Sequence, residues 1–167
     1  MSFESLGLSA PVLQAVADKG YTEPTPIQEK AIPLVLAGRD VLGLAQTGTG
    51  KTAAFVLPIL QRLGKGASRQ TRVLIVAPTR ELAEQTHQTI VDLGKGTKVK
   101  SVSIYGGVSK GPQAAALRRG VEIVVAVTLG CEVLLGVVTQ KQVVPCATDQ
   151  GVVLAAATEF VVAVLAV

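Results

Sequence analysis

The sequence has no tryptophan, only five other aromatic residues and only two cysteines. A core with so few aromatic rings must be filled by Ala, Val, Leu and Ile, which is typical of helices packed on a parallel sheet. Cys131 and Cys146 have neither the spacing of metal ligands nor a disulfide-rich setting. Residues 1–13 lack the basic start and apolar core of a signal peptide. We therefore expect a cytoplasmic protein.

Net charge is also small, at +4, so the composition permits a polyanionic partner without requiring one. The charges are unevenly distributed. Residues 1–127 hold 15 of the 16 Lys and Arg and 9 of the 12 Asp and Glu. The apolar stretch 151–167 is short for a membrane span and contains Glu159, so we interpret it as a buried strand. A chain of 167 residues suits one domain, and we predict a single domain over 1–167 with an atypical, charge-poor tail at 128–167.

Helix and strand signals alternate along residues 1–127. Ser9 and Thr25 each precede a helical pattern, and Gly20 and Gly38 are placed to end those helices. Apolar strands are expected at 40–44, 72–77 and 122–126, with Val102 and Ile104 in another, and helices are expected between them. This alternation predicts an α/β domain with a parallel sheet and helices on both faces. Ligands of such sheets bind at the carboxyl ends of the strands.

The strongest chemical signal follows the first predicted strand. Residues 45–52 form a Walker A loop with Ala in place of the first Gly, located between a predicted strand and a predicted helix as this motif requires. Glycines let backbone N–H groups surround a phosphate, and the helix directs its positive end toward it. Lys51 would hold the β- and γ-phosphates, and the Thr52 hydroxyl would bind Mg²⁺. The loop consists of Ala45, Gln46, Thr47, Gly48, Thr49, Gly50, Lys51 and Thr52.

Three further segments have ordinary structural explanations when each is taken alone. Gln28 is the far end of a capping box that begins at Thr25, with Pro26 at the first helical position. The segment 78–83, PTRELA, reads as a helix start at a strand's carboxyl end, where free N–H groups and an arginine suit phosphate. The pair Gly106-Gly107 reads as a plain turn after a strand.

Together and in this order, these segments resemble DEAD-box ATP-dependent RNA helicases, most closely bacterial RhlE-type members. The match is to the N-terminal RecA-like domain, a P-loop NTPase fold. The resemblance implies ATP and Mg²⁺ as cofactors, RNA as a partner, and a second RecA-like domain of the same parent chain that closes over both. It also implies that Gln28 reads adenine and that Phe3 and Tyr21 lie beside the adenine base. The implied RNA contacts are Pro78, Thr79, Arg80, Gly106, Gly107 and Thr128.

The resemblance fails after residue 127. The family's Thr-Pro-Gly-Arg motif would fall at 127–131, where this chain reads VTLGC, so the RNA-facing arginine is missing. Its Val-Leu-Asp-Glu-Ala-Asp motif would fall at 153–158, where Ala155, Ala156 and Thr158 replace the three carboxylates. Alanine can neither accept a proton nor organise the water shell of a metal ion. Glu159 is displaced by one residue, which on a strand turns its side chain to the other face.

Two interpretations of residues 128–167 stay open. The segment is either a variant that binds ATP without hydrolysing it, or a stretch that differs from the parent protein's own sequence, as after a frameshift or an engineered replacement. The first function we expect is an ATPase domain of an RNA helicase that couples ATP binding and hydrolysis to duplex remodelling in the full-length protein. The alternative is a non-catalytic ATP- or RNA-binding module. An unrelated P-loop ATPase would require Phe3 and Gln28 to lie far from the base.

Overall fold

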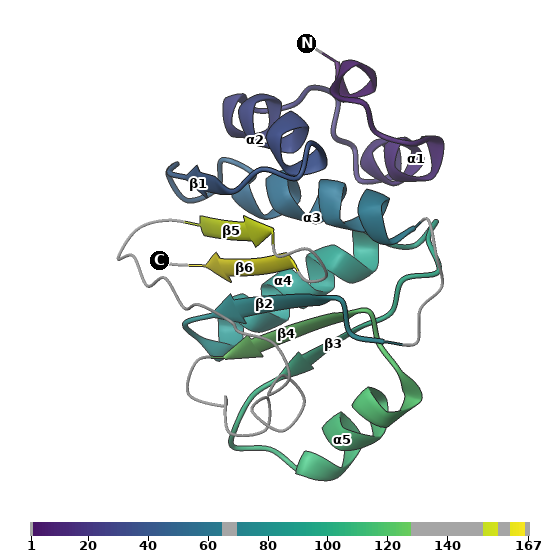
Figure 1. Ribbon diagram of the computed structural model, residues 1–167, viewed down its shortest axis with the longest axis vertical. Coiled ribbons are helices and arrows are strands. Elements are labelled where there is room, and N and C mark those ends of the chain that lie inside the picture. Colours follow the sequence, from purple (N-terminus) through teal and green to yellow (C-terminus); the bar gives the residue numbers. More distant parts are fainter. Residues whose placement is uncertain (1, 65–69, 128–151, 157–160, 166–167) are drawn as a thin grey trace.

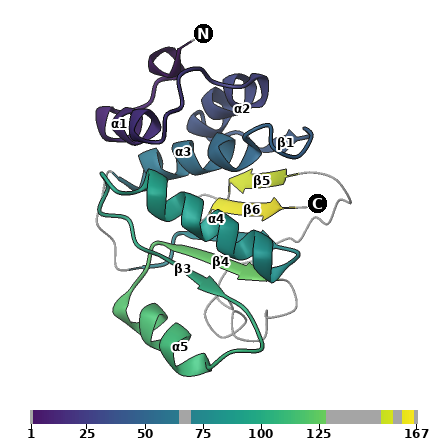
Figure 2. The same cartoon turned by 180° about the vertical axis from the view of Figure 1, so that it is seen from behind.

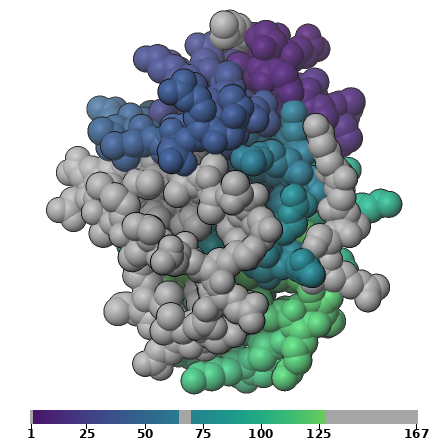
Figure 3. All heavy atoms as spheres, viewed as in Figure 1, coloured from purple at the N-terminus to yellow at the C-terminus, as the bar shows by residue number. Residues whose placement is uncertain are grey.

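The computed structural model describes residues 2–64, 70–127, 152–156 and 161–165 (Figure 1). Its helices are η1 (Phe3–Leu6), α1 (Ala10–Asp18), α2 (Pro26–Leu36), α3 (Lys51–Leu63), α4 (Arg80–Leu93) and α5 (Lys110–Arg119). Its strands are β1 (Val41–Gly43), β2 (Val73–Ala77), β3 (Ser101–Ile104), β4 (Ile123–Val127), β5 (Val152–Ala156) and β6 (Val161–Leu165). Elements η1, α1 and α2 lie at one end of the molecule and α5 at the other (Figure 3).

The six strands form one sheet in the order β1-β5-β6-β2-β4-β3. Strands β3, β4, β2 and β6 pair in parallel, which confirms the predicted parallel sheet for this part of the domain. Strand β5 is antiparallel to both of its neighbours, β1 and β6, and its arrow in Figure 1 points the opposite way from theirs. Since β1 and β6 are both antiparallel to β5, β1 runs in the same direction as β6, β2, β4 and β3.

The apolar tail contributes two strands where one was predicted. Val152–Ala156 and Val161–Leu165 pair antiparallel to each other and lie between β1 and β2. The sheet therefore contains β6 as a parallel neighbour of β2, and β5 as the strand next to β1. A continuous run of Val, Ala and Leu predicts a buried strand but carries no information about its direction.

Helices cover both faces of the sheet. On one face, α4 packs over β2 and β4 (Figure 2), α3 packs against α4, and Phe55, Ile75 and Ile123 belong to one buried cluster. On the other face, Leu117 of α5 packs against the cluster that contains Val124. Alternate residues of β2 and β4 belong to the two clusters, so both faces of these strands are buried. This explains their continuous apolar sequences.

The local sequence signals set the helix ends. Pro11 and Pro26 each occupy the first turn of a helix, after Ser9 and Thr25 at the N-cap position. Gly20 and Gly38 follow α1 and α2 with φ values of 75° and 76°, in the left-handed region that favours glycine. None of the helices in the described ranges is long and apolar enough to span a bilayer.

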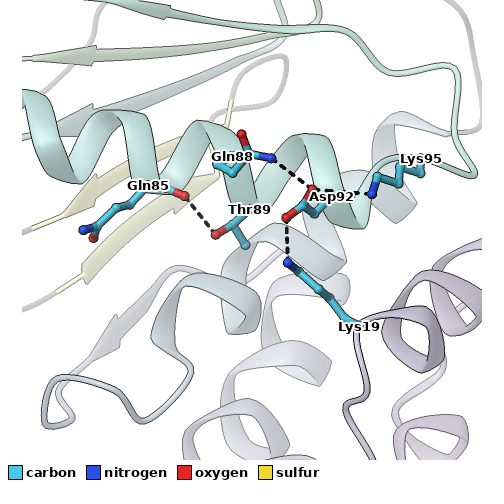
Figure 4. Close-up of polar contacts among 6 residues, drawn as sticks. All are labelled: Lys19, Gln85, Gln88, Thr89, Asp92 and Lys95. Atoms are coloured by element: carbon cyan, nitrogen blue, oxygen red, sulfur yellow. Dashed lines mark hydrogen bonds and ion pairs between the residues drawn. The ribbon is translucent and has the colours of Figure 1, made fainter.

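An ion pair connects α1 to α4 (Figure 4). Lys19 Nζ donates to Asp92 Oδ2 at 2.6 Å, while Gln88 Nε2 donates to Asp92 Oδ1 at 3.0 Å. Lys95 Nζ lies 3.6 Å from the same Oδ1 atom. The hydrogen bond from Lys19, followed by that from Gln88, lowers the pKa of the Asp92 carboxyl. This contact fixes the end of α1, immediately before the Gly20–Gln28 segment, against the helix that begins at Arg80.

Candidate functional site

The loop between β1 and α3 has the geometry that the sequence predicted. Strand β1 ends at Gly43 and α3 begins at Lys51. Gly48 and Gly50 have φ values of 81° and 83°, which side-chain-bearing residues rarely adopt. The Thr49 hydroxyl donates to the Gln46 carbonyl oxygen at 2.7 Å and closes the turn. The chain thus makes a strand, a tight glycine-dependent loop and a helix in immediate succession.

Lys51 and Thr52 form the first turn of α3, where backbone N–H groups have no partner within the helix. Lys51 is half-buried, and its ammonium group donates to the carbonyl oxygen of Ala45, across the loop. The Thr52 side chain is also half-buried. A cation, a hydroxyl and the positive end of a thirteen-residue helix therefore meet at one loop. This combination suits a phosphate group and its metal ion.

Gln28 joins α2 to this loop. Its Nε2 donates to the carbonyl oxygen of Gly50 at 3.1 Å, and its Oε1 accepts the N–H of Thr25 at 3.0 Å. The predicted capping box between Thr25 and Gln28 is present, although Thr25 Oγ1 makes no close hydrogen bond in the described part of the chain. The Gln28 side chain is 3% exposed. Its amide retains one further N–H and one further lone pair, the pair of groups that can read an adenine edge.

The two aromatic residues assigned to the base side lie in contact with each other. The rings of Phe3 and Tyr21 stack with centroids 6.5 Å apart and an angle of 22° between their planes. Phe3 is buried in the main core at 5% exposure, whereas Tyr21 is 37% exposed. The accessible ring is therefore that of Tyr21, and Phe3 supports it from the core side.

The segment 78–80 and the Gly106-Gly107 turn both follow parallel strands of the sheet. Arg80 starts α4 directly after β2, and the Thr79 hydroxyl accepts the N–H of Leu82 at 3.3 Å as an N-cap. The turn directly follows β3 and its neighbour Tyr105. Both segments leave the sheet at the same edge as the loop after β1. With two strands between β1 and β2, the separation across the sheet is about 14 Å.

The structure adds three residues that sequence patterns did not single out. The Arg80 guanidinium lies over the Tyr105 ring, 4.4 Å from its centroid, and Arg80 Nε lies 3.3 Å from Glu84 Oε1. Gln113 accepts the N–H of Tyr105 at 3.1 Å and donates to its carbonyl oxygen at 3.2 Å. The i,i+4 spacing of Arg80 and Glu84 was a readable signal. The contact of Arg80 with Tyr105 depends on the arrangement of strands far apart in sequence. The contact of Gln113 with Tyr105 spans eight residues.

The residues aligned with the family's acidic motif do not lie beside the phosphate-binding loop. Because β5 is antiparallel to β1, Ala155 and Ala156 lie toward the edge opposite to the loop at 44–50. Residues 153–156 therefore do not take the place expected for a strand parallel to β1. Thr128, Ala157 and Thr158 lie outside the described residues. Among the residues that are described, no three His, Cys, Asp or Glu side chains are grouped as metal ligands.

Comparisons with known proteins agree with this geometry. The sequence model for the DEAD/DEAH box helicase family matches residues 25–158. The chain is 51% identical over 126 residues to the ATP-dependent RNA helicase dbp10 of Schizosaccharomyces pombe, covering 75% of this chain and 15% of that protein. It is 49% identical over 125 residues to the DEAD-box ATP-dependent RNA helicase RhpA of Helicobacter pylori, covering 75% and 25% respectively.

Two solved structures have the same fold. The RNA helicase Prp28 of Chaetomium thermophilum bound to ADP matches with a TM-score of 0.73 and 41% identity, over 86% of this chain and 35% of that one. A DEAD box protein from the hyperthermophile Methanococcus jannaschii matches with a TM-score of 0.68 and 37% identity, over 76% and 34%. The chain thus spans a quarter or less of the two curated relatives and about a third of the structural ones.

Proposed function

Because the chain belongs to the DEAD/DEAH box helicase family, we propose that it is the ATP-binding, N-terminal RecA-like domain of an ATP-dependent RNA helicase. The observation that carries the proposal is the bond from Gln28 Nε2 to the Gly50 carbonyl, which joins the glutamine segment to the phosphate-binding loop. In the parent protein, this domain would couple ATP binding and hydrolysis to remodelling of RNA duplexes. A second RecA-like domain would complete the site.

ATP would bind across the α2–α3 junction. The N–H groups of the loop at 45–50 and of the first turn of α3 would surround the β- and γ-phosphates. Lys51 Nζ would exchange its bond with the Ala45 carbonyl for a phosphate oxygen. Of the described residues, Thr52 is the one that would hold Mg²⁺, and the phosphates and water would supply the other ligands. When bound, Mg²⁺ neutralises charge on the phosphates.

The Gln28 amide supports adenine as the base. Its free N–H would donate to an acceptor on the adenine edge, and its free oxygen lone pair would accept from a donor there. Its two bonds within the protein hold the amide in one orientation, so little side-chain entropy would be lost on binding. Guanine presents the opposite donor and acceptor pattern on its corresponding edge, so selectivity for ATP over GTP would follow.

RNA would bind at the same edge of the sheet, beside β2 and β3. The first turn of α4 and the half-exposed Arg80 side chain would bind phosphate oxygens. The exposed Gly106-Gly107 turn would let the backbone of the RNA approach the main chain.

Hydrolysis of ATP has to be considered separately from binding, because no carboxylate is present at 153–158. We therefore propose that the isolated chain binds ATP and does not hydrolyse it.

Titration with a fluorescent ATP analogue in the presence of Mg²⁺ tests this proposal. Lys51→Ala should weaken binding by at least tenfold, because it removes the cation from the loop. Lys30→Ala is the matched control, since Lys30 is an exposed lysine on α2, outside the loop. If both variants bind the analogue as tightly as the unaltered chain, the phosphate site is not at this loop.

A further inference from the structure

Tyr105 connects the two segments assigned to RNA. It follows β3 directly and precedes the Gly106-Gly107 turn, while Arg80 follows β2 at the start of α4. Strand β4 lies between β2 and β3, and all three are parallel. The carboxyl ends of β2 and β3 are therefore next-nearest neighbours at one edge of the sheet. This places the Arg80 guanidinium over the Tyr105 ring, 4.4 Å from the centroid.

The stacking geometry leaves Arg80 able to bind an anion. A guanidinium on an aromatic face uses its flat surface for the ring and keeps its N–H donors in the plane. Nε is directed to Glu84 Oε1, at 3.3 Å, and the side chain remains 51% exposed. Contact with the Tyr105 hydroxyl, and then with Arg80, lowers the pKa of Glu84, so this carboxylate stays ionised beside Arg80. The terminal nitrogens of Arg80 are the donors left for phosphate.

Tyr105 is itself fixed by Gln113. One amide side chain accepts the N–H of Tyr105 at 3.1 Å and donates to its carbonyl oxygen at 3.2 Å. The same Nε2 lies 3.4 Å from the Ser109 carbonyl oxygen, on the far side of the Gly-Gly turn. Gln113 belongs to the first turn of α5 and is half-buried. A single side chain therefore spans the whole 105–109 loop and attaches it to a helix.

We propose that Tyr105 is a positioning residue for RNA binding, which holds the Arg80 guanidinium in its phosphate-binding orientation, and that Gln113 fixes Tyr105 for this role. The proposal rests on the proposed contact of Arg80 with RNA. An unrestrained arginine loses about 2 kcal/mol of rotamer entropy when it is immobilised. An arginine already held on a ring loses less of it on binding. Loss of the ring should therefore weaken the Arg80 contact without removing its charge.

The test is a double-mutant cycle on the affinity for a fluorescein-labelled single-stranded RNA of 12 to 20 uridines, at several salt concentrations. Arg80→Ala should weaken binding and reduce the slope of log affinity against log salt by about 0.7, the value for one contact with single-stranded RNA. Tyr105→Leu should weaken binding by about two- to fivefold, the range for a partly exposed cation–π contact. It should leave the salt slope unchanged, because the charge remains.

Two further variants separate positioning from general damage to the fold. Tyr105→Phe keeps the ring and should retain an affinity within about twofold of the unaltered chain. In the Arg80→Ala background, Tyr105→Leu should cause no further loss, since the residue acts through Arg80. Gln113→Ala should weaken binding in the original background by a factor similar to that of Tyr105→Leu. Thermal melting and affinity for the ATP analogue check that each variant is folded.

The outcomes distinguish the two proposals. If the unaltered chain does not bind RNA, or if Arg80→Ala binds RNA as tightly as the unaltered chain, the proposed RNA contact is wrong. The positioning role then fails with it. If Arg80→Ala weakens binding but Tyr105→Leu does not, the RNA contact stands and the positioning role is overturned. The same conclusion follows if the losses caused by the two substitutions are fully additive.

Discussion

The Gln28 amide nitrogen donates to the Gly50 carbonyl oxygen at 3.1 Å, across 22 residues of sequence. Gly50 is also the N-cap residue of α3, whose first residue is Lys51. A side chain proposed to read the base is therefore bonded to the residue that starts the phosphate-binding helix. Movement of either group changes the position of the other.

This contact makes Gly50→Ala more damaging than a typical glycine substitution. A Cβ atom at Gly50 would lie 2.4 Å from Gln28 Nε2, and the residue has a φ of 83°. We expect a loss of about 1–2 kcal/mol of stability from the backbone alone and a large loss of ATP affinity from the displaced glutamine. Thermal melting and titration with the ATP analogue measure the two effects.

Gly48→Ala is the matched control for that substitution. Gly48 has a similar φ of 81°, but no described atom lies within 4 Å of its Cβ position. It carries the same backbone cost without the clash. The difference between the two variants therefore isolates the Gln28 contact, and equal effects on ATP affinity would show that this contact is unimportant.

The two threonine N-caps should respond differently to removal of their hydroxyl groups. Thr79 Oγ1 accepts the Leu82 N–H at 3.3 Å, so Thr79→Val should cost about 1 kcal/mol. Thr25 belongs to a capping box but its Oγ1 makes no close hydrogen bond in the described residues, so Thr25→Val should cost less than Thr79→Val. Chemical denaturation compares the two. A loss at Thr25 as large as that at Thr79 would mean that the Thr25 hydroxyl has a partner.

The ion pair between Lys19 and Asp92 predicts a pH dependence of stability. The pKa of Asp92 is lowered, first by the hydrogen bond from Lys19. A carboxyl with a lowered pKa in the folded state contributes stability at neutral pH, and this contribution is lost as pH falls through the folded pKa. Asp92→Asn should therefore lower Tm by about 1–3 °C at pH 7 and low salt.

The same comparison at acid pH provides the check. Below about pH 4, where a free aspartate is protonated, the difference in Tm between the unaltered chain and Asp92→Asn should shrink. Lys19→Met should reproduce the decrease in Tm at pH 7, because it removes the hydrogen bond from Lys19, the largest of the interactions that lower the pKa of Asp92. A difference in Tm that is independent of both pH and salt would mean that Asp92 acts through packing.

Phosphate release should distinguish binding from hydrolysis. The segment 153–158 has no carboxylate, and β5 directs Ala155 and Ala156 away from the loop at 44–50. No group at these positions can hold the metal's waters or activate a nucleophile. We expect the chain to bind ATP and to release phosphate at the uncatalysed rate, with or without RNA. Sustained turnover above that of Lys51→Ala would contradict this expectation.

The sequence was most informative where the chemistry requires particular residues at fixed spacing. Only glycine takes the left-handed conformation readily, so the pattern around Gly48 and Gly50 predicted the loop geometry. The strand before it and the helix after it were confirmed in place. The N-cap at Thr79 follows from the same local rules.

The direction of strands and the contacts between side chains far apart in sequence could not be predicted in this way. The apolar runs at 152–156 and 161–165 are compatible with either strand direction, and their antiparallel pairing depends on the rest of the sheet. The stacking of Arg80 on Tyr105 requires two strands to be next-nearest neighbours. Phe3 was expected beside a base, and its burial against Tyr21 became apparent only from the packing of η1.

The most direct test of the account is a competition titration of ATP against GTP for the chain with Mg²⁺ and the fluorescent ATP analogue. If Gln28 reads the base, ATP should compete at least tenfold better than GTP, and Gln28→Ala should remove most of this preference. Equal competition by ATP and GTP for the unaltered chain would contradict the adenine site. The loop at 45–52 would then bind phosphate without a base-reading partner in α2.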